Sequence, residues 1–113
     1  GVFRKQSNSL IGFFAHSMLE PVCGSKAIIG VDGLSVKFGL TTPIHQEAEV
    51  TRLMIERTQG PVIVAADHGK MGVVSNFVTA PIKKVNILIT DSGIKQDFRK
   101  MLEEMGIRVI IAE

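Results

Sequence analysis

Four short runs of aliphatic residues are spaced along the chain, and Ile and Val dominate each of them. The runs are almost continuously apolar instead of alternating, which is typical of strands covered on both faces of a sheet. Strands of this kind are usually parallel, because a crossover helix returns the chain to the same end of the sheet. We therefore predict four buried strands, at residues 27–31, 62–66, 85–90 and 108–112.

The clearest helical pattern lies between the last two predicted strands. Apolar residues recur there at i, i+4, i+7, i+8 and i+11, which is the spacing of one helix face. We expect Asp91 or Ser92 to cap the start of this helix and Gly106 to adopt a left-handed conformation after its end. The residues of the apolar face are Ile94, Phe98, Met101, Leu102 and Met105.

A second helix is predicted at residues 46–59, between the first two strands. Thr42 and Pro43 supply a plausible cap and first helical residue, and Gly60 followed by Pro61 ends the helix. A further helix is predicted near the front of the chain, at residues 10–19. The apolar stripe of the second helix, at i, i+3 and i+4, consists of Val50, Leu53 and Met54.

Strands that alternate with helices predict βαβ units joined by right-handed crossovers. We therefore expect an α/β fold with three layers, in which helices cover both faces of a mostly parallel sheet. No internal repeat, linker or low-complexity segment interrupts residues 1–113, so we expect a single domain.

Charge and composition limit the partners that these residues can bind. The 113 residues include 13 basic and 11 acidic side chains that are dispersed along the chain, for a net charge of +2. This distribution creates no strong field for a nucleic acid. The apolar runs are far shorter than the roughly 20 residues that cross a bilayer, so we expect no membrane span.

The ends of the chain and its cysteine content also carry information. Cys23 is the single cysteine, which excludes an internal disulfide and a cysteine-cluster metal site and favours a cytoplasmic protein. The chain starts at Gly1 instead of Met, and its last predicted strand runs almost to Glu113. We therefore expect a fragment or processed piece of a longer protein.

Candidate chemistry lies where two predicted strands end. Asp32 and Gly33 follow the first strand, and Asp67, His68 and Lys70 follow the second. Ligands of parallel sheets bind at the carboxyl ends of the strands. If the two strands are neighbours, the Asp32 carboxylate would accept hydrogen bonds from a polyol, and the Lys70 amine would neutralise an anion.

The segment after the first strand adds further candidates. Thr41 and Thr42 offer hydroxyls, and the following helix offers free amides for an anion. Glu47 and Glu49 lie in the first turn of that helix, where either carboxylate faces the pocket or simply complements the helix dipole. An Asp-Gly pair after a strand is also typical of a plain turn, so a structural role for Asp32 stays open.

Several kinds of site find no support in the sequence. There is no G-x-G-x-x-G after a strand and no Walker loop, which argues against a dinucleotide or a nucleoside triphosphate. No His lies at metal-ligand spacing from a second ligand, and Cys23 has no recognisable catalytic partner. We therefore expect neither a metal nor a cofactor.

Five segments of the chain form an ordered set: GVFRKQSNSLIG (1–12), KAIIGVDG (26–33), GLTTPIHQEAEVTRLM (39–54), VIVAADHGKMG (62–72) and ILITD (87–91). Taken together and in order, they resemble the effector-sensing domain of the DeoR family of bacterial transcription regulators. The first resembles that family's Gly-aromatic-basic stretch before Ser-Leu-x-Gly, and the next three resemble its Gly-Val-Asp-Gly turn, its Gly-Leu-Thr-Thr turn with an acidic helix, and its Ala-Asp-x-x-Lys-x-Gly strand end. The fifth resembles its Ile-Thr-Asp strand.

This resemblance implies a fold shared with ribose-5-phosphate isomerase and a regulator that responds to a phosphorylated sugar. It implies a pocket formed by Asp32, Gly33, an acid in the Glu47 to Glu49 stretch, and Lys70. The family's winged helix-turn-helix and its Asp-x-Gly-Ser-Thr phosphate loop have no counterpart in these residues. DNA binding is therefore expected only through a part of the protein outside this chain.

Three functions stay open at this point. The first is a sensor that binds a phosphorylated sugar without chemistry, in a protein that we expect to form a homo-oligomer. The second is an isomerase-like enzyme with a Glu as general base and Lys70 stabilising negative charge. The third is a subunit whose exposed sheet edge and helices serve mainly for oligomerisation.

Overall fold

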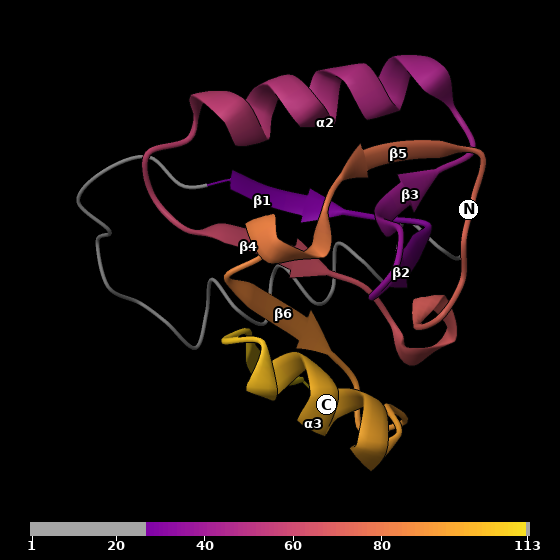
Figure 1. The fold of residues 1–113 in the computed structure, drawn as a ribbon, viewed down its shortest axis with the longest axis vertical. Helices are drawn as coiled ribbons and strands as arrows, with labels where there is room; N and C mark the ends of the chain where they lie inside the picture. Colours follow the sequence, from indigo (N-terminus) through magenta and orange to yellow (C-terminus); the bar gives the residue numbers. More distant parts are fainter. Residues whose placement is uncertain (1–26, 113) are drawn as a thin grey trace.

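A computed structural model of the protein describes residues 27–112 (Figure 1). Seven strands, two α-helices and two short 3-10 turns make up this part of the chain. In chain order they are β1 (Ala27–Gly30), β2 (Gly33–Ser35), β3 (Gly39–Thr42), α2 (His45–Arg57), β4 (Val62–Ala65), η1 (His68–Lys70), β5 (Phe77–Ala80), η2 (Ile82–Lys84), β6 (Ile87–Thr90), α3 (Gln96–Glu104) and β7 (Arg108–Ile111).

The main sheet is parallel throughout and has the strand order β1-β4-β6-β7. Ala27 lies opposite Val62, Ile63 opposite Ile87, and Leu88 opposite Val109. All four strands predicted from the apolar runs are present within one or two residues of their predicted bounds. The prediction of an α/β fold with a mostly parallel sheet is confirmed.

Both faces of this sheet are buried, which explains why the strands are apolar at consecutive positions. Val64 and Leu88 belong to a large core cluster on one face, to which α2 contributes Ile55 and α3 contributes Leu102. Ile63, Ala65 and Ile89 form a second cluster on the other face. All four residues of β4 are buried as a result. The helix predicted at residues 10–19 lies outside the described residues.

A second, smaller sheet was not predicted. It is antiparallel, with the order β2-β3-β5, and a register shift interrupts the β3–β5 pairing between Leu40 and Thr41. No strand was predicted in the segment that holds β2 and β3. Both strands bury polar side chains, Ser35 in β2 and Thr41 and Thr42 in β3, next to the single leucines Leu34 and Leu40. No apolar pattern therefore marks these strands in the sequence.

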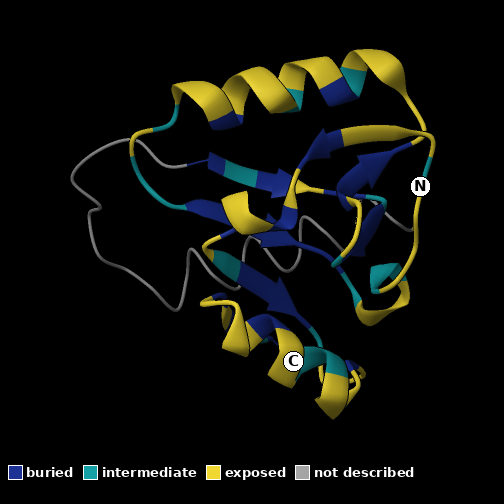
Figure 2. Cartoon of the chain, in the orientation of Figure 1, coloured by how far each residue is buried: buried dark blue, intermediate teal, exposed yellow. Residues whose placement is uncertain are grey.

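Helix α2 forms as predicted, but its expected apolar stripe was wrong. Val50, Leu53 and Met54 are 60%, 45% and 44% exposed, whereas Ala48 and Ile55 are buried. Ala48 and Ile55 lie two turns apart, so α2 buries a narrow stripe against β5, β3 and β1, and most of the helix is exposed (Figure 2).

The helix begins within one residue of its predicted bound, but the predicted cap of α2 was wrong. Thr42 is the last residue of β3, and the residue before the helix is Ile44, which makes no side-chain capping bond. The Thr42 hydroxyl instead donates toward two carboxylates, so it is not available to cap the helix.

Helix α3 is confirmed, with a later start than predicted. Leu102 is buried and Ile94 is buried just before the helix, but Met101 and Met105 are more than 40% exposed. Neither Asp91 nor Ser92 caps the helix, because Lys95 precedes its first residue and Asp91 accepts from the amide of Gly93 in a separate turn. Gly106 has a φ of 88°, as predicted for the residue after the helix.

Neither described α-helix is long and apolar enough to cross a bilayer.

Candidate functional site

Three acidic residues lie at the carboxyl edge of the parallel sheet. Asp32 follows β1, Asp67 follows β4 and Asp91 directly follows β6. Because these strands are parallel neighbours, their carboxyl ends meet at the same edge, where ligands of α/β sheets bind. The fold therefore brings together residues that are far apart in the sequence.

Asp32, Thr42 and Glu47 form what we call the acid cluster. The Thr42 hydroxyl lies 2.9 Å from Asp32 Oδ2 and 3.4 Å from Glu47 Oε2. A hydroxyl carries one proton, so the shorter contact to Asp32 is the stronger one. The cluster depends on the antiparallel sheet, because β3 places Thr42 beside the turn after β1 and leads directly into the first turn of α2.

The structure separates the two glutamates that the sequence left equivalent. Glu47 is half-buried and contacts Thr42. Glu49 is exposed, and its Oε1 lies 3.4 Å from Nε2 of His45, one helical turn earlier. Glu47 is therefore the acid that shares Thr42 with Asp32, whereas Glu49 contacts His45 at the surface.

Gly33 and Thr41 hold the neighbouring loop against the cluster. The buried Thr41 hydroxyl accepts from the amide of Ser75 at 2.9 Å, and the carbonyl of Thr41 accepts from the amide of Asp32 at 3.2 Å. A Cβ at Gly33 would collide with the backbone oxygen of Val73. Both residues therefore shape the site by close backbone packing.

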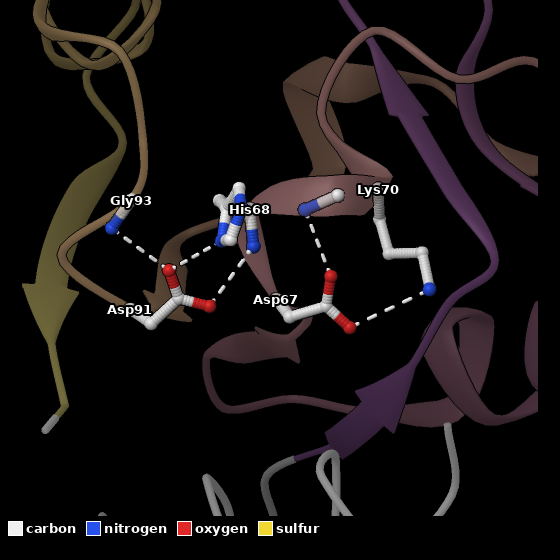
Figure 3. A network of polar contacts seen from close by, with 6 residues as sticks. Asp67, His68, Lys70, Asp91 and Gly93 are labelled. Carbon is white, nitrogen blue, oxygen red and sulfur yellow. Dashed lines mark hydrogen bonds and ion pairs between the residues drawn. The ribbon is translucent and has the colours of Figure 1, made fainter. Parts of the chain in front are cut away.

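Lys70 lies in the η1 turn, next to the small sheet. Its Nζ is 3.4 Å from Asp67 Oδ2, and the two side chains are 20% and 12% exposed. A bridge between Leu34 and Met71 joins this turn to β2. In Figure 3 the Lys70 side chain extends away from Asp91, toward the chain that joins β1 to β2. The amine is thus directed away from the His68 side of the turn.

On the other side of the turn, Asp91 holds His68 in a fixed position, a contact that the sequence did not reveal. Asp91 Oδ1 lies 2.7 Å from His68 Nδ1 and accepts from the amide of Gly93 at 2.8 Å, while Oδ2 accepts from the amide of His68 at 3.1 Å (Figure 3). Partial burial by itself raises the pKa of Asp91. The hydrogen bonds from the two backbone amides and from the His68 ring outweigh it and hold that pKa below its ordinary value. The signal in the sequence is the Asp-x-Gly turn directly after a strand.

A cavity of about 420 Å³ lies beside His68, on the α3 side of the η1 turn. Of the candidate residues that follow the two predicted strands, His68 lines this cavity, whereas Asp32 and Lys70 do not. The lining residues are His68, Met71, Gly93, Lys95, Asp97, Phe98 and Met101. Among the described residues, no group of three or more His, Cys, Asp or Glu side chains is placed to hold a metal ion.

The comparison with protein families identifies the chain. The family described as the DeoR C terminal sensor domain matches residues 1–92. The chain belongs to the DeoR C-terminal sensor domain family. The resemblance drawn from the five segments is therefore confirmed.

Relatives of this DeoR sensor chain include proteins named as transcription regulators. It is 32% identical over 110 residues to the HTH-type transcriptional regulator GlpR of Haloferax volcanii. This alignment covers 97% of this chain and 43% of the relative. It is 32% identical to the HTH-type transcriptional repressor GlcR of Bacillus subtilis, over 100% of this chain and 43% of the relative. It is 29% identical to the HTH-type transcriptional regulator GolR of Listeria innocua, over 100% of this chain and 44% of the relative. The chain thus spans less than half the length of these relatives.

Proposed function

We propose that this chain is the ligand-sensing part of a DeoR-type transcription regulator, and that it binds a phosphorylated sugar beside the acid cluster. The observation that carries this proposal is the contact of Asp32, Thr42 and Glu47 at the carboxyl edge of the sheet. Within the described residues, Thr42 is the side chain that hydrogen-bonds to Asp32, so a carboxylate oxygen can still accept from a ligand hydroxyl.

The two charges of the site suit the two ends of a sugar phosphate. Carboxylates accept hydrogen bonds from sugar hydroxyls, and the Lys70 ammonium group neutralises a phosphate as a point charge. Asp67 holds Lys70 in place through the 3.4 Å ion pair. Gly33 keeps the turn after β1 close to the neighbouring loop. Thr41 and Glu49 stay outside the proposed site, because their polar atoms contact Ser75 and His45.

In this proposal the ligand acts by binding one state of the regulator more tightly than another. Such a ligand shifts the balance between DNA-competent and incompetent forms, by as much as its affinities for the two forms differ. DNA contact belongs to a part of the protein outside this chain. Assembly into a homo-oligomer and a cytoplasmic location stay predictions.

A thermal-shift screen of phosphorylated sugars against the full-length protein tests the proposal. A ligand that binds the native state raises the unfolding midpoint in proportion to saturation. We expect at least one phosphorylated sugar to raise the midpoint, and its unphosphorylated form to have a much smaller effect. Asp32→Ala and Lys70→Ala should each abolish the shift, while Glu49→Ala should leave it unchanged. A shift that survives both site variants would place the ligand elsewhere.

Relatives named as regulators support binding over catalysis in this chain. Incubation of the same sugar phosphate with the protein, followed by NMR analysis of the sugar, distinguishes the two functions. We expect the sugar to be recovered unchanged. Interconversion of an aldose phosphate and a ketose phosphate that is lost in Glu47→Gln would instead favour the isomerase-like alternative.

A further inference from the structure

We propose that the cavity beside His68 is a second ligand site, and that it takes a small monocarboxylate with an apolar body. This site lies on the opposite side of the η1 turn from Lys70 and shares no residue with the acid cluster. The proposal does not depend on the identity of the ligand that binds beside Asp32.

The first argument is the way in which the His68 ring is fixed. Asp91 Oδ1 lies 2.7 Å from Nδ1 of His68, so the carboxylate selects the tautomer with its proton on Nδ1. In the neutral ring of this tautomer Nε2 is an acceptor, so an anionic ligand is bound by the imidazolium form, in which Nε2 also carries a hydrogen and donates. The His68 side chain is 57% exposed and lines the cavity, so a ligand can reach this nitrogen.

Gly93 provides a second constraint on the same ring. A Cβ at Gly93 would lie 2.5 Å from His68 Nδ1 and 2.9 Å from Asp91 Oδ1. The ring therefore packs directly against the backbone at Gly93, in a space that only glycine leaves open. A surface histidine would not need two such constraints, whereas a preorganised binding group does.

The lining of the cavity indicates the class of ligand. Met71, Phe98 and Met101 supply apolar and polarisable surface, while His68 and Lys95 supply hydrogen-bond donors. A volume of about 420 Å³ is within the range of small-molecule sites. An apolar body with an acidic group matches these two kinds of surface.

Asp97 explains why we expect a single negative charge on the ligand. This carboxylate also lines the cavity, and its Oδ1 accepts from the amide of Phe98 at 2.9 Å. A second charge on the ligand would meet repulsion from Asp97, so a phosphate dianion fits less well than a carboxylate.

NMR titration of the full-length protein with 3-phenylpropanoate as the probe tests the site. We expect the backbone amide signals of His68, Gly93 and Phe98 to shift, and those of Asp32 and Thr42 to stay in place. The neutral analogue 3-phenylpropan-1-ol should bind about tenfold more weakly, because it lacks the charge that His68 and Lys95 recognise. Equal binding of the two compounds would refute the carboxylate assignment.

Substitutions separate the site from general binding to apolar surface. His68→Ala should weaken 3-phenylpropanoate about tenfold, and Lys95→Gln should weaken it severalfold without disturbing the fold, since Lys95 is exposed. His45→Ala removes an exposed histidine on α2 and should have no effect. The proposal is wrong if the probe shifts no amide near the cavity at millimolar concentration, or if His45→Ala and His68→Ala weaken binding equally.

Discussion

Asp32 and Asp91 follow two strands of the same parallel sheet, yet the two carboxylates have opposite surroundings. Within the described residues, Asp91 accepts from two backbone amides and contacts the His68 ring, whereas Asp32 accepts from the Thr42 hydroxyl. Both carboxylate oxygens of Asp91 therefore already accept hydrogen bonds, and these bonds hold two loops of the protein together. Asp32 can still accept further hydrogen bonds from a ligand. Position at the strand ends selects both acids as candidates, and their partners distinguish the structural acid from the binding acid.

If Asp91 is the structural acid of the two, its removal should have the largest effect on the stability of the protein. Asp91→Ala leaves the amides of His68 and Gly93 without their acceptor, and each hydrogen bond to a charged group contributes about 1.5–3 kcal/mol. Because both amides lie in exposed loops, we expect the free energy of unfolding to fall by about 2 kcal/mol in urea denaturation. Asp32→Ala should lower it by less than about 1 kcal/mol. Equal losses would remove the distinction between the two acids.

The next effect is expected at the hydroxyl that joins the acid cluster. Thr42→Val keeps the shape of the buried side chain but removes the donor to Asp32 and Glu47. The free energy of unfolding should fall by about 1 kcal/mol, the usual contribution of one hydrogen bond. Thr42→Ser restores the hydroxyl and should recover most of this loss, as measured by the same denaturation. A serine variant no better than valine would show that the hydroxyl does not hold the cluster.

The smallest effect is a dependence on pH that belongs to Asp91. Its pKa in the folded protein lies below the ordinary value of 3.8, so folding favours the charged form. The stabilisation is present above that value and is lost as the pH falls through the lower, folded-state pKa. Wild type and Asp91→Asn should therefore differ in unfolding free energy at neutral pH, and the difference should shrink as the pH falls below 3.8 and through the folded-state pKa of Asp91. A difference that stays constant over this range would contradict the ionic role of Asp91.

The parallel sheet was predictable because its strands are continuous apolar runs, which burial on both faces requires. The strands β2, β3 and β5 left no such pattern, since polar side chains such as Thr41, Thr42 and Thr79 are buried in them. The exposed apolar stripe of α2 shows a further limit of prediction from apolar spacing. Apolar spacing at Val50, Leu53 and Met54 predicts a helix correctly, but it does not say which side the neighbouring sheet covers.

The candidate site was predictable in part for the same physical reason. Asp32 and Lys70 follow apolar runs, so their place at the sheet edge follows from strand order alone. The choice of Glu47 over Glu49 depends on β3, which no pattern predicts. The contact between His68 and Asp91 spans 23 residues and arises only because β4 and β6 are neighbours.

The measurement that tests the central claim most directly is calorimetric titration of a phosphorylated sugar into Glu47→Gln and Glu49→Gln. The two variants make the same chemical change two residues apart in α2, once beside Asp32 and once at the surface. We predict that Glu47→Gln weakens binding about tenfold or more, the loss of a hydrogen bond to a charged group, and that Glu49→Gln changes it less than about twofold. Equal weakening by the two variants, or a larger effect at Glu49, would contradict a binding site at the acid cluster.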